Sequence, residues 1–322
     1  SGLVISSALT LWSPLAGKLY FSDLAGASLG CLLVLGLFGI FGGPGTLLFA
    51  CLLGGMVSGV FGGMKGRRGV FPWIWTGFLV GLLFWQPSWM GLRLSPYKSL
   101  STALQFPGAR LLETRWNAAS RVDVLESPAA RTAPGLSLEY LDSLPEQLGI
   151  TIDGDQLNAI TRVRGEPAGA GELKFLEFLP SSFPYRALEP GRVLILDPRG
   201  GLEVLNALYH GVKEIVVAET NPLVADLLKT RYGEFSGGIY TRRGVRVVVE
   251  DGRSFLHRAP QPFDLILLPL SESLGASATG FSGLQEDYRL TVEAFGEYFR
   301  ALNPGGFLSF SLYLLPPPRG EL

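Results

Sequence analysis

The stretch Arg192-Val-Leu-Ile-Leu-Asp-Pro-Arg-Gly-Gly-Leu-Glu-Val-Leu-Asn-Ala-Leu208 decides the fold of this chain. It reads as a buried strand, a turn with two glycines and the first turns of a helix. A second apolar run ends in Glu219, eighteen residues after Gly201. A strand, a glycine turn, a helix and a carboxylate at the next strand end are how open α/β sheets hold the ribose of a nucleotide-like cofactor.

The glycine turn departs from that pattern at two positions. A G-x-G-x-G fingerprint places glycines at 197 and 199, where this chain has Asp197 and Arg199. Glycines let the backbone approach a bound cofactor closely, and side chains at these positions obstruct that approach. The sequence therefore predicts a cofactor-type fold together with weak or absent cofactor binding.

Strands and helices alternate from this turn toward the C-terminus. Gly211 ends the first helix, and Pro222 stands in the first turn of the second, which are the usual places for these residues. Such alternation implies a parallel sheet with helices on both faces, so we expect a Rossmann-like domain over 189–322. Strands are expected at 193–196, 215–219, 245–249, 263–268 and 307–312, and helices at 202–210, from 221 and at 285–302.

Residues 93–188 have a different pattern, with short alternating segments broken by turns. Arg121–Leu125 and Gly149–Asp153 have the period-two alternation of half-buried strands. Asp153-Gly154-Asp155 is a turn, after which Gln156–Val163 returns as a hairpin partner. We expect a small β-rich N-terminal subdomain here.

Residues 1–92 are almost free of charged side chains, with a net charge of +3 against −4 for the rest of the chain. Three charge-free apolar runs, 24–41, 44–64 and 69–92, are each close to the ~20 residues that cross a bilayer as a helix. A signal peptide is the alternative for the first run, but two more runs follow it. We expect a transmembrane segment of roughly three helices that contacts the lipid bilayer.

Two glycine patterns in these runs favour close packing of helices. Gly26 and Gly30, and then Gly55, Gly59 and Gly63, recur every four residues and place small side chains on one helix face. Other transmembrane helices, of this protein or of a partner subunit, are the expected neighbours. The alternative is that glycine is simply frequent in such helices.

The rest of the composition excludes several classes. The weakly acidic second part carries no basic stripe, so nucleic acid is not an expected partner. Cys31 and Cys51 lie in the apolar part, and the chain has two histidines, His210 and His257. We therefore expect no metal site and infer no disulfide framework.

The chain resembles the spermidine synthase (polyamine aminopropyltransferase) group, in its membrane-fused bacterial branch. That group has a class I methyltransferase fold behind a β-hairpin domain. The helices of the large membrane-fused members are similar to Tyr20–Gly30. The resemblance rests on Val193–Leu208, Val216–Val224, Val245–Leu256, Phe263–Leu268 and Leu302–Phe310, and more loosely on Ser95–Lys98 and Ile152–Asp155.

This resemblance implies a site for decarboxylated S-adenosylmethionine if the protein is active. Gly200 and Gly201 would lie beside the amino-acid end of that cofactor and Glu219 on its ribose. Asp251, followed by Gly252, would lie near the adenine. The alternative for both carboxylates is that they cap a helix or face solvent.

The catalytic part departs further from the group. An aspartate at the end of strand four, with another three residues later, helps to deprotonate the attacking amine in that family. Pro269 and Glu272 occupy these positions here, and Glu172-Leu173-Lys174 stands where the family has Tyr-His-Glu. Glu272 is the remaining catalytic candidate, and a solvated loop is its simpler explanation.

Two functions stay open from the sequence. One is a membrane-anchored, non-catalytic binding or assembly module for which no cofactor is expected. The other is an active aminopropyltransferase, or another S-adenosyl-dependent transferase, acting on a small amine. Regulation of transport by helices outside this segment is a third idea. The chain begins Ser-Gly and stops after Leu322, so we expect a piece of a longer protein with the last domain truncated.

A multi-pass position in the bacterial inner membrane follows from the resemblance and the apolar runs. Lys65, Arg67 and Arg68, between the second and third runs, favour a cytoplasmic loop. A single crossing by 69–92 then places the soluble domain on the outer face. In the competing account, 69–92 lies in the interface and the domain stays inside.

Overall fold

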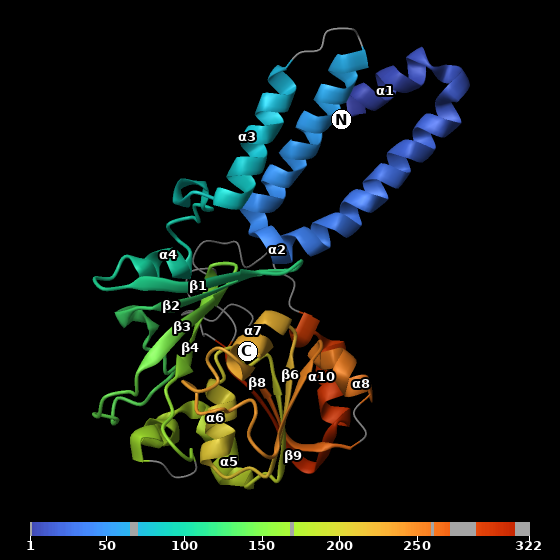
Figure 1. Cartoon of the computed structure of the whole chain (residues 1–322). Helices are drawn as coiled ribbons and strands as arrows, with labels where there is room; N and C mark the ends of the chain where they lie inside the picture. The colour runs from blue at the N-terminus through green and yellow to red at the C-terminus, as the bar shows by residue number, and fades with distance from the viewer. Residues whose placement is uncertain (1, 65–69, 168–170, 259–260, 271–287, 313–322) are drawn as a thin grey trace. The chain divides into compact units, whose positions relative to one another are not determined.

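The structure is a computed structural model that describes residues 2–64, 70–167, 171–258, 261–270 and 288–312 (Figure 1). The chain forms two compact units. The first comprises Ser1–Arg93 and Arg115–Ser120, and the second Leu94–Thr114 and Arg121–Leu322. Lys65, Arg67, Arg68 and Glu272 lie outside the described residues.

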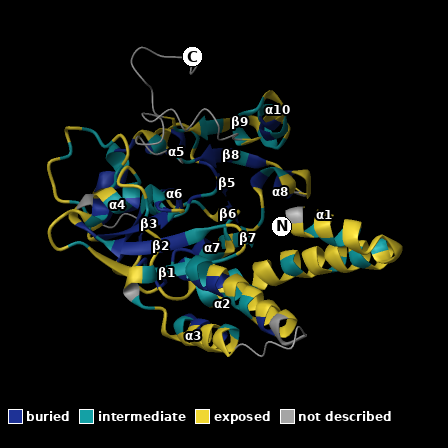
Figure 2. Ribbon diagram, turned by 90° about the horizontal axis from the view of Figure 1, so that it is seen from above, coloured by how far each residue is buried: buried dark blue, intermediate teal, exposed yellow. Residues whose placement is uncertain are grey.

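The first unit is built from apolar helices, α1 (Gly2–Leu11), α2 (Ala16–Met64) and α3 (Phe71–Trp85). Among the described residues, one helical stretch of 49 residues, Ser13–Phe61, is long and apolar enough to cross a membrane. Its most apolar window is not buried against the protein, and Figure 2 shows these helices as largely exposed. The structure thus gives one candidate span where the sequence predicted roughly three.

Two local features explain this difference. The first two predicted runs lie on either side of Gly42 in α2, and Gly42 leaves the helical conformation (φ 66°, ψ −176°), so α2 consists of two helical stretches joined by a kink. The third run, 69–92, is helical over only 15 residues, ~22 Å against a hydrocarbon core of ~30 Å. Gln86 ends α3 in a left-handed conformation (φ 37°), and Pro87, which follows it, has no N–H group with which to continue the helix.

The repeated glycines of α2 fall into two groups. A Cβ added at Gly55 would lie 2.8 Å from Thr76 Oγ1, and one at Gly59 would lie 3.0 Å from the Trp73 ring. These two glycines therefore permit the close approach of α2 and α3. A Cβ at Gly26 or Gly30 would meet nothing within 4 Å in the described chain.

A four-stranded sheet opens the second unit, with strand order β1-β2-β3-β4. Its strands are β1 (Arg110–Trp116), β2 (Arg121–Glu126), β3 (Gln147–Ile152) and β4 (Asp155–Thr161). The predicted hairpin is present: β3 and β4 pair antiparallel, and Asp153 and Gly154 between them both have positive φ, as tight hairpin turns require. β1, whose last two residues belong to the first unit, was not predicted.

A five-stranded parallel sheet follows, with strand order β7-β6-β5-β8-β9. Its strands are β5 (Arg192–Leu196), β6 (Glu214–Glu219), β7 (Val245–Val249), β8 (Phe263–Leu268) and β9 (Leu302–Phe310). Strand order reverses at β5, the first strand of the sheet in sequence. Ligands of such sheets bind outside the carboxyl ends of the strands at this reversal. The predicted α/β fold with a parallel sheet is confirmed.

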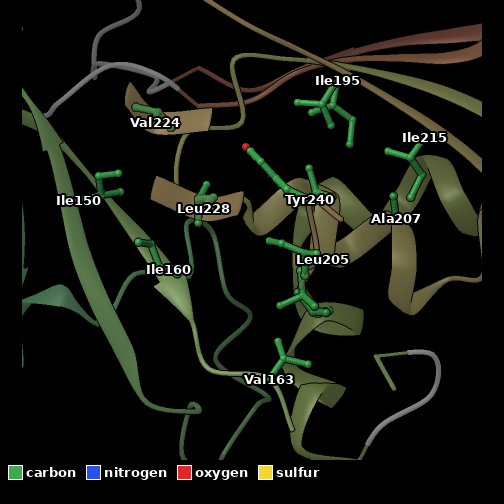
Figure 3. Packing of buried hydrophobic residues seen from close by; sticks show 14 of the residues in the cluster. Ile150, Ile160, Val163, Ile195, Leu205, Ala207, Ile215, Val224, Leu228 and Tyr240 are labelled. Atoms are coloured by element: carbon green, nitrogen blue, oxygen red, sulfur yellow. The ribbon is translucent and has the colours of Figure 1, made fainter. Parts of the chain in front are cut away.

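Helices cover both faces of the parallel sheet (Figure 1). Val193 and Ile195 of β5 pack in one apolar cluster with α6 (Leu202–Tyr209) and α7 (Pro222–Lys229). The alternate residues, Leu194 and Leu196, pack in a second cluster with α8 (Gly252–Arg258) and α10 (Val292–Arg300). The small sheet contributes to the first cluster through side chains such as Ile150 and Ile160 (Figure 3).

The turn after β5 touches the small sheet through backbone atoms. A Cβ built at Gly200 would overlap the carbonyl group of Ala159 on β4. Only glycine permits this approach, because the obstructing atoms belong to a backbone that cannot rotate away. The contact joins the two sheets of the second unit at the glycine turn.

We predict that Gly200→Ala lowers the free energy of unfolding by ~1–3 kcal/mol, because it overpacks a rigid contact. Gly191→Ala is the matched control, since a Cβ there would meet only Asp264 Oδ2 at 3.5 Å. Denaturant unfolding of the whole chain in detergent measures both. Equal effects of the two substitutions would contradict the close contact at Gly200.

Candidate functional site

Four residues at the carboxyl ends of strands meet at one edge of the parallel sheet. Asp197 follows β5, Glu219 ends β6, Asp251 follows β7 and Pro269 follows β8. Because the strands are parallel, all four ends lie on one edge. This edge is where the resemblance placed a cofactor site if the protein is active.

Glu219 is buried there with its carboxylate engaged by the chain. Its side chain is 1% exposed. Oε2 accepts the backbone N–H of Arg199 at 3.1 Å, and Oε1 accepts that of Asn221 at 3.2 Å. Both oxygens thus have partners within the protein.

Burial raises the pKa of Glu219 from 4.5 to about 7. The negative charge of Asp197 raises it further, whereas the two backbone N–H groups and the Arg199 guanidinium lower it. Desolvation penalises the charged form more than these partners favour it. Glu219 therefore exchanges its proton near neutral pH.

The two turn glycines have structural reasons of their own. Gly200 approaches Ala159, as described above. Gly201 has φ +84° directly before α6, and a Cβ there would lie 2.5 Å from Ile239 Cδ1. Their roles beside a cofactor stay predictions, because packing and backbone conformation alone already require glycine.

Asp251 and Gly252 begin a helix that the sequence did not predict. Asp251 is exposed, and its Oδ1 accepts the backbone N–H of Ser254 at 3.0 Å in the first turn of α8. A Cβ at Gly252 would lie 2.8 Å from Leu196 Cδ2 on β5. The capping alternative accounts for Asp251, and contact with an adenine stays a prediction.

Arg199 links the turn to the small sheet. Its guanidinium Nη1 donates a hydrogen bond to Gln156 Oε1 at the start of β4. Both residues have left-handed backbones, with φ 52° at Arg199 and φ 53° at Gln156. Such conformations cost non-glycine residues energy and persist where the surrounding structure fixes them.

Asp197 completes the charged group at this edge. It too has positive φ (47°), and its Oδ1 accepts the backbone N–H of Thr220 at 2.8 Å. Its Oδ2 lies 3.5 Å from Arg289 Nη1. Two carboxylates therefore face two arginines supplied by the chain itself.

Tyr240 lies beneath the turn, with its ring in the first apolar cluster (Figure 3). A Cβ at Gly201 would lie 3.6 Å from its Cε1. Its buried hydroxyl has no hydrogen-bond partner within the described part of the chain. Burial raises the tyrosine pKa well above 10, and the charges of Glu219 and Asp197 add to that rise.

The sequence did not indicate Gln156, Tyr240 or Arg289 as site residues. Gln156 is 43 residues from Arg199, and the fold alone brings them together. No motif marks any of the three. The predicted candidate Glu272 falls in 271–287, outside the described residues.

Three residues stand where the group that the chain resembles has Tyr-His-Glu. Glu172, Leu173 and Lys174 lie in a 3₁₀ helix, Gly171–Phe178. Leu173 is fully buried, and Glu172 accepts the backbone N–H of Arg164 at 3.1 Å.

Within the ranges that the structure describes, no group of three His, Cys, Asp or Glu side chains is placed to hold a metal ion.

Three curated relatives are polyamine aminopropyltransferases. The chain is 26% identical to that of Streptococcus uberis over 122 residues, 38% of this chain and 39% of the relative. It is 25% identical to that of Sulfurisphaera tokodaii over 126 residues, 38% and 41%. It is 27% identical to that of Mycobacterium tuberculosis over 177 residues, 53% and 32%. The matched regions thus span less than half the length of each relative.

No protein-family profile matches the chain. Two solved structures align with 60% of it and with 53% of their own chains. They are a spermidine synthase in complex with the transition state analogue AdoDATO (16% identity, TM-score 0.36) and the spermidine synthase of Thermotoga maritima (18%, 0.37). The related sequences, rather than these superpositions, support the spermidine synthase family for this chain.

The raised pKa of Glu219 predicts how stability depends on pH. The folded state favours the protonated form of Glu219, so its protonation adds to the free energy of unfolding. This contribution is complete below pH ~4.5 and is lost as pH rises through ~7. The loss is on the order of 3 kcal/mol. Glu219→Gln should remove this fall from the pH profile of the unfolding free energy. An unchanged profile in the variant would assign the proton to another group.

Proposed function

We propose that this chain is part of a membrane-anchored spermidine synthase-like protein whose soluble part is a non-catalytic binding or assembly module. The observation that carries the proposal is the engagement of Glu219. The carboxylate expected to hold a ribose accepts two backbone N–H groups of its own chain instead. Each oxygen of this carboxylate accepts one of these bonds, so a ribose hydroxyl would have to share Glu219 with the chain.

The chemistry at the end of β8 supports the same proposal. A protonated amine has no lone pair, so aminopropyl transfer needs a base. Pro269 can neither accept a proton nor bind an ammonium group. The buried Leu173 stands in place of the second residue of the substrate-binding triplet. Both parts of the family's amine site are therefore replaced among the described residues.

The residues at the sheet edge also fit an S-adenosyl cofactor poorly. Glu219 has the right position on β6, but the Arg199 side chain spans from the glycine turn to Gln156. Arg199 thereby adds a positive charge to the turn that follows β5, and S-adenosyl sulfonium compounds are cationic as well. We therefore derive no reaction step through this cofactor.

An active aminopropyltransferase is the second candidate. All three relatives described above carry that name, which favours it. In that case decarboxylated S-adenosylmethionine would be the cofactor and a small amine the substrate. Fold and family alone do not establish this activity, because the site residues are what changed.

Anchoring in a bacterial inner membrane is proposed from α2. A straight helix of 49 residues is ~74 Å long, more than twice the hydrocarbon core. The break at Gly42 allows this helix to enter the bilayer and return, which would make the protein multi-pass. Gly26 and Gly30 then offer a face to other transmembrane helices, of this protein or of a partner subunit.

The length of α3 bears on which side the soluble part occupies. The outward-facing prediction required 69–92 to cross the membrane once, and only 15 of these residues are helical. We propose instead that α3 stays near the interface and that the soluble part lies on the cytoplasmic side, with the basic loop.

We predict that the chain does not convert putrescine, and that Pro269→Asp alone does not restore turnover, because the substrate-binding triplet is also replaced. Chromatography of reactions containing the whole chain, putrescine and decarboxylated S-adenosylmethionine detects the product. An active spermidine synthase assayed in the same detergent is the positive control. Turnover by the unmodified chain would establish the second candidate.

We also predict that a cysteine at Leu138 is protected from a membrane-impermeant thiol reagent in intact cells and reacts after lysis. Leu138 is 96% exposed, so a thiol at this position is open to the reagent. Cys31 and Cys51 are replaced by alanine first, because both are exposed free thiols. Labelling in intact cells would restore the outward assignment.

A further inference from the structure

Arg199 holds a strained position that two separate contacts fix. Its backbone N–H donates to Glu219 Oε2, and its guanidinium donates to Gln156 Oε1. The residue adopts φ 52°, where glycine would carry no steric cost. Gln156, its partner on β4, is strained in the same way. Strain of this kind concentrates at functional positions.

The guanidinium also carries a charge that matters for ligands. It belongs to the turn at the carboxyl end of β5, where ligands of this fold bind. S-adenosyl compounds carry a positive sulfonium centre, and two like charges repel strongly in a partly buried site. A fixed cation at such a site selects against cationic ligands, as repulsive elements do in other specific sites.

The remainder of the edge keeps features that suit an adenosine group. Glu219 lies at the end of β6, and Gly201 opens α6 beside it. The Tyr240 hydroxyl next to Gly201 is buried and has no hydrogen-bond partner in the described ranges. A buried hydroxyl left unpaired is costly, so this position suits a polar atom of a bound molecule.

We propose that Arg199, anchored by Gln156, is a specificity-determining residue that excludes cationic S-adenosyl compounds from an edge otherwise able to bind adenosine thioethers and sulfonium compounds. This proposal rests on the proposed function, in which the site catalyses no reaction. It goes further by assigning the exclusion of the cationic cofactor to one side chain. The other changes, at Pro269 and in the triplet, concern the amine and leave adenosine binding intact.

Calorimetry on the whole chain in detergent tests the proposal with decarboxylated S-adenosylmethionine and with 5′-methylthioadenosine, its uncharged thioether counterpart. The unmodified chain should show no saturable binding of the cation at millimolar ligand. Arg199→Gly removes the charge, the bulk and the backbone strain, and should bind both ligands at least roughly tenfold more tightly than the unmodified chain. Arg199→Lys keeps the charge and should still exclude the cation.

Two further variants sharpen the test. Gln156→Leu releases the anchor but leaves the charge, so its affinity should fall between those of the unmodified chain and Arg199→Gly. Arg242→Gly is the matched control, because Arg242 also makes several contacts, to Gly237 and Gly165 carbonyls and to Glu166, but away from the turn. This control variant should bind the two ligands no more tightly than the unmodified chain does. Circular dichroism and the thermal midpoint establish that each variant is folded.

Each outcome has one meaning. A folded Arg199→Gly that binds neither ligand overturns the assignment to Arg199 while the non-catalytic function stands. Binding of the cation by the unmodified chain, or by Arg199→Lys as tightly as by Arg199→Gly, also overturns it. Putrescine turnover by the unmodified chain overturns the proposed function itself.

Discussion

The backbone contact between Gly200 and Ala159 is the constraint on which the second unit depends. It brings β4 directly onto the turn that follows β5, with no side chain between them. Gln156 lies three residues before Ala159 on β4, and Arg199 lies one residue before Gly200. The contact therefore sets the reach of the Arg199–Gln156 hydrogen bond, and a larger residue at 200 would separate both pairs.

The charges at the sheet edge balance one another within the chain. Asp197 is paired with Arg289, and the positive charge of Arg199 favours the ionised form of Glu219, so each of these two carboxylates has one cationic neighbour. The balance is incomplete at Glu219, whose pKa is still raised by burial and by Asp197. An added cation would have to compete with two arginines that are already in place, and an added anion would meet two carboxylates.

Much of the second unit follows from sequence periodicity, and the exceptions have physical causes. The parallel strands were predictable because each is a short apolar run followed by a glycine, proline or acidic turn. α8 was missed because it has only seven residues. Helix capping, the alternative given for Asp251 from the sequence, is what the structure shows, and its contact with an adenine stays a prediction. Arg199 was recognised as an obstruction, but its partner Gln156 depends on the packing of two sheets. Such long-range contacts leave no local pattern.

In the first unit, composition alone overestimated the number of spans. Hydropathy gives the length of an apolar run but not the point at which its helix ends. The run 69–92 contains Pro87, and Gln86 before it adopts a left-handed conformation that ends α3 after 15 residues. Gly42 lies between the first two predicted runs, and its non-helical conformation divides α2 into two stretches at that point.

Retained motif residues at this site differ in what they imply. Gly200, Gly201 and Gly252 each have a packing partner that excludes a Cβ, and Asp251 caps a helix. These residues would persist for the sake of the fold even if all ligand binding were lost. Glu219 is different, because burying its carboxylate costs stability near neutral pH. Glu219 is present although its burial costs stability, which is expected if it still serves a ligand site. An edge that Arg199 alone closes to cationic ligands explains this better than an edge that can no longer bind any ligand.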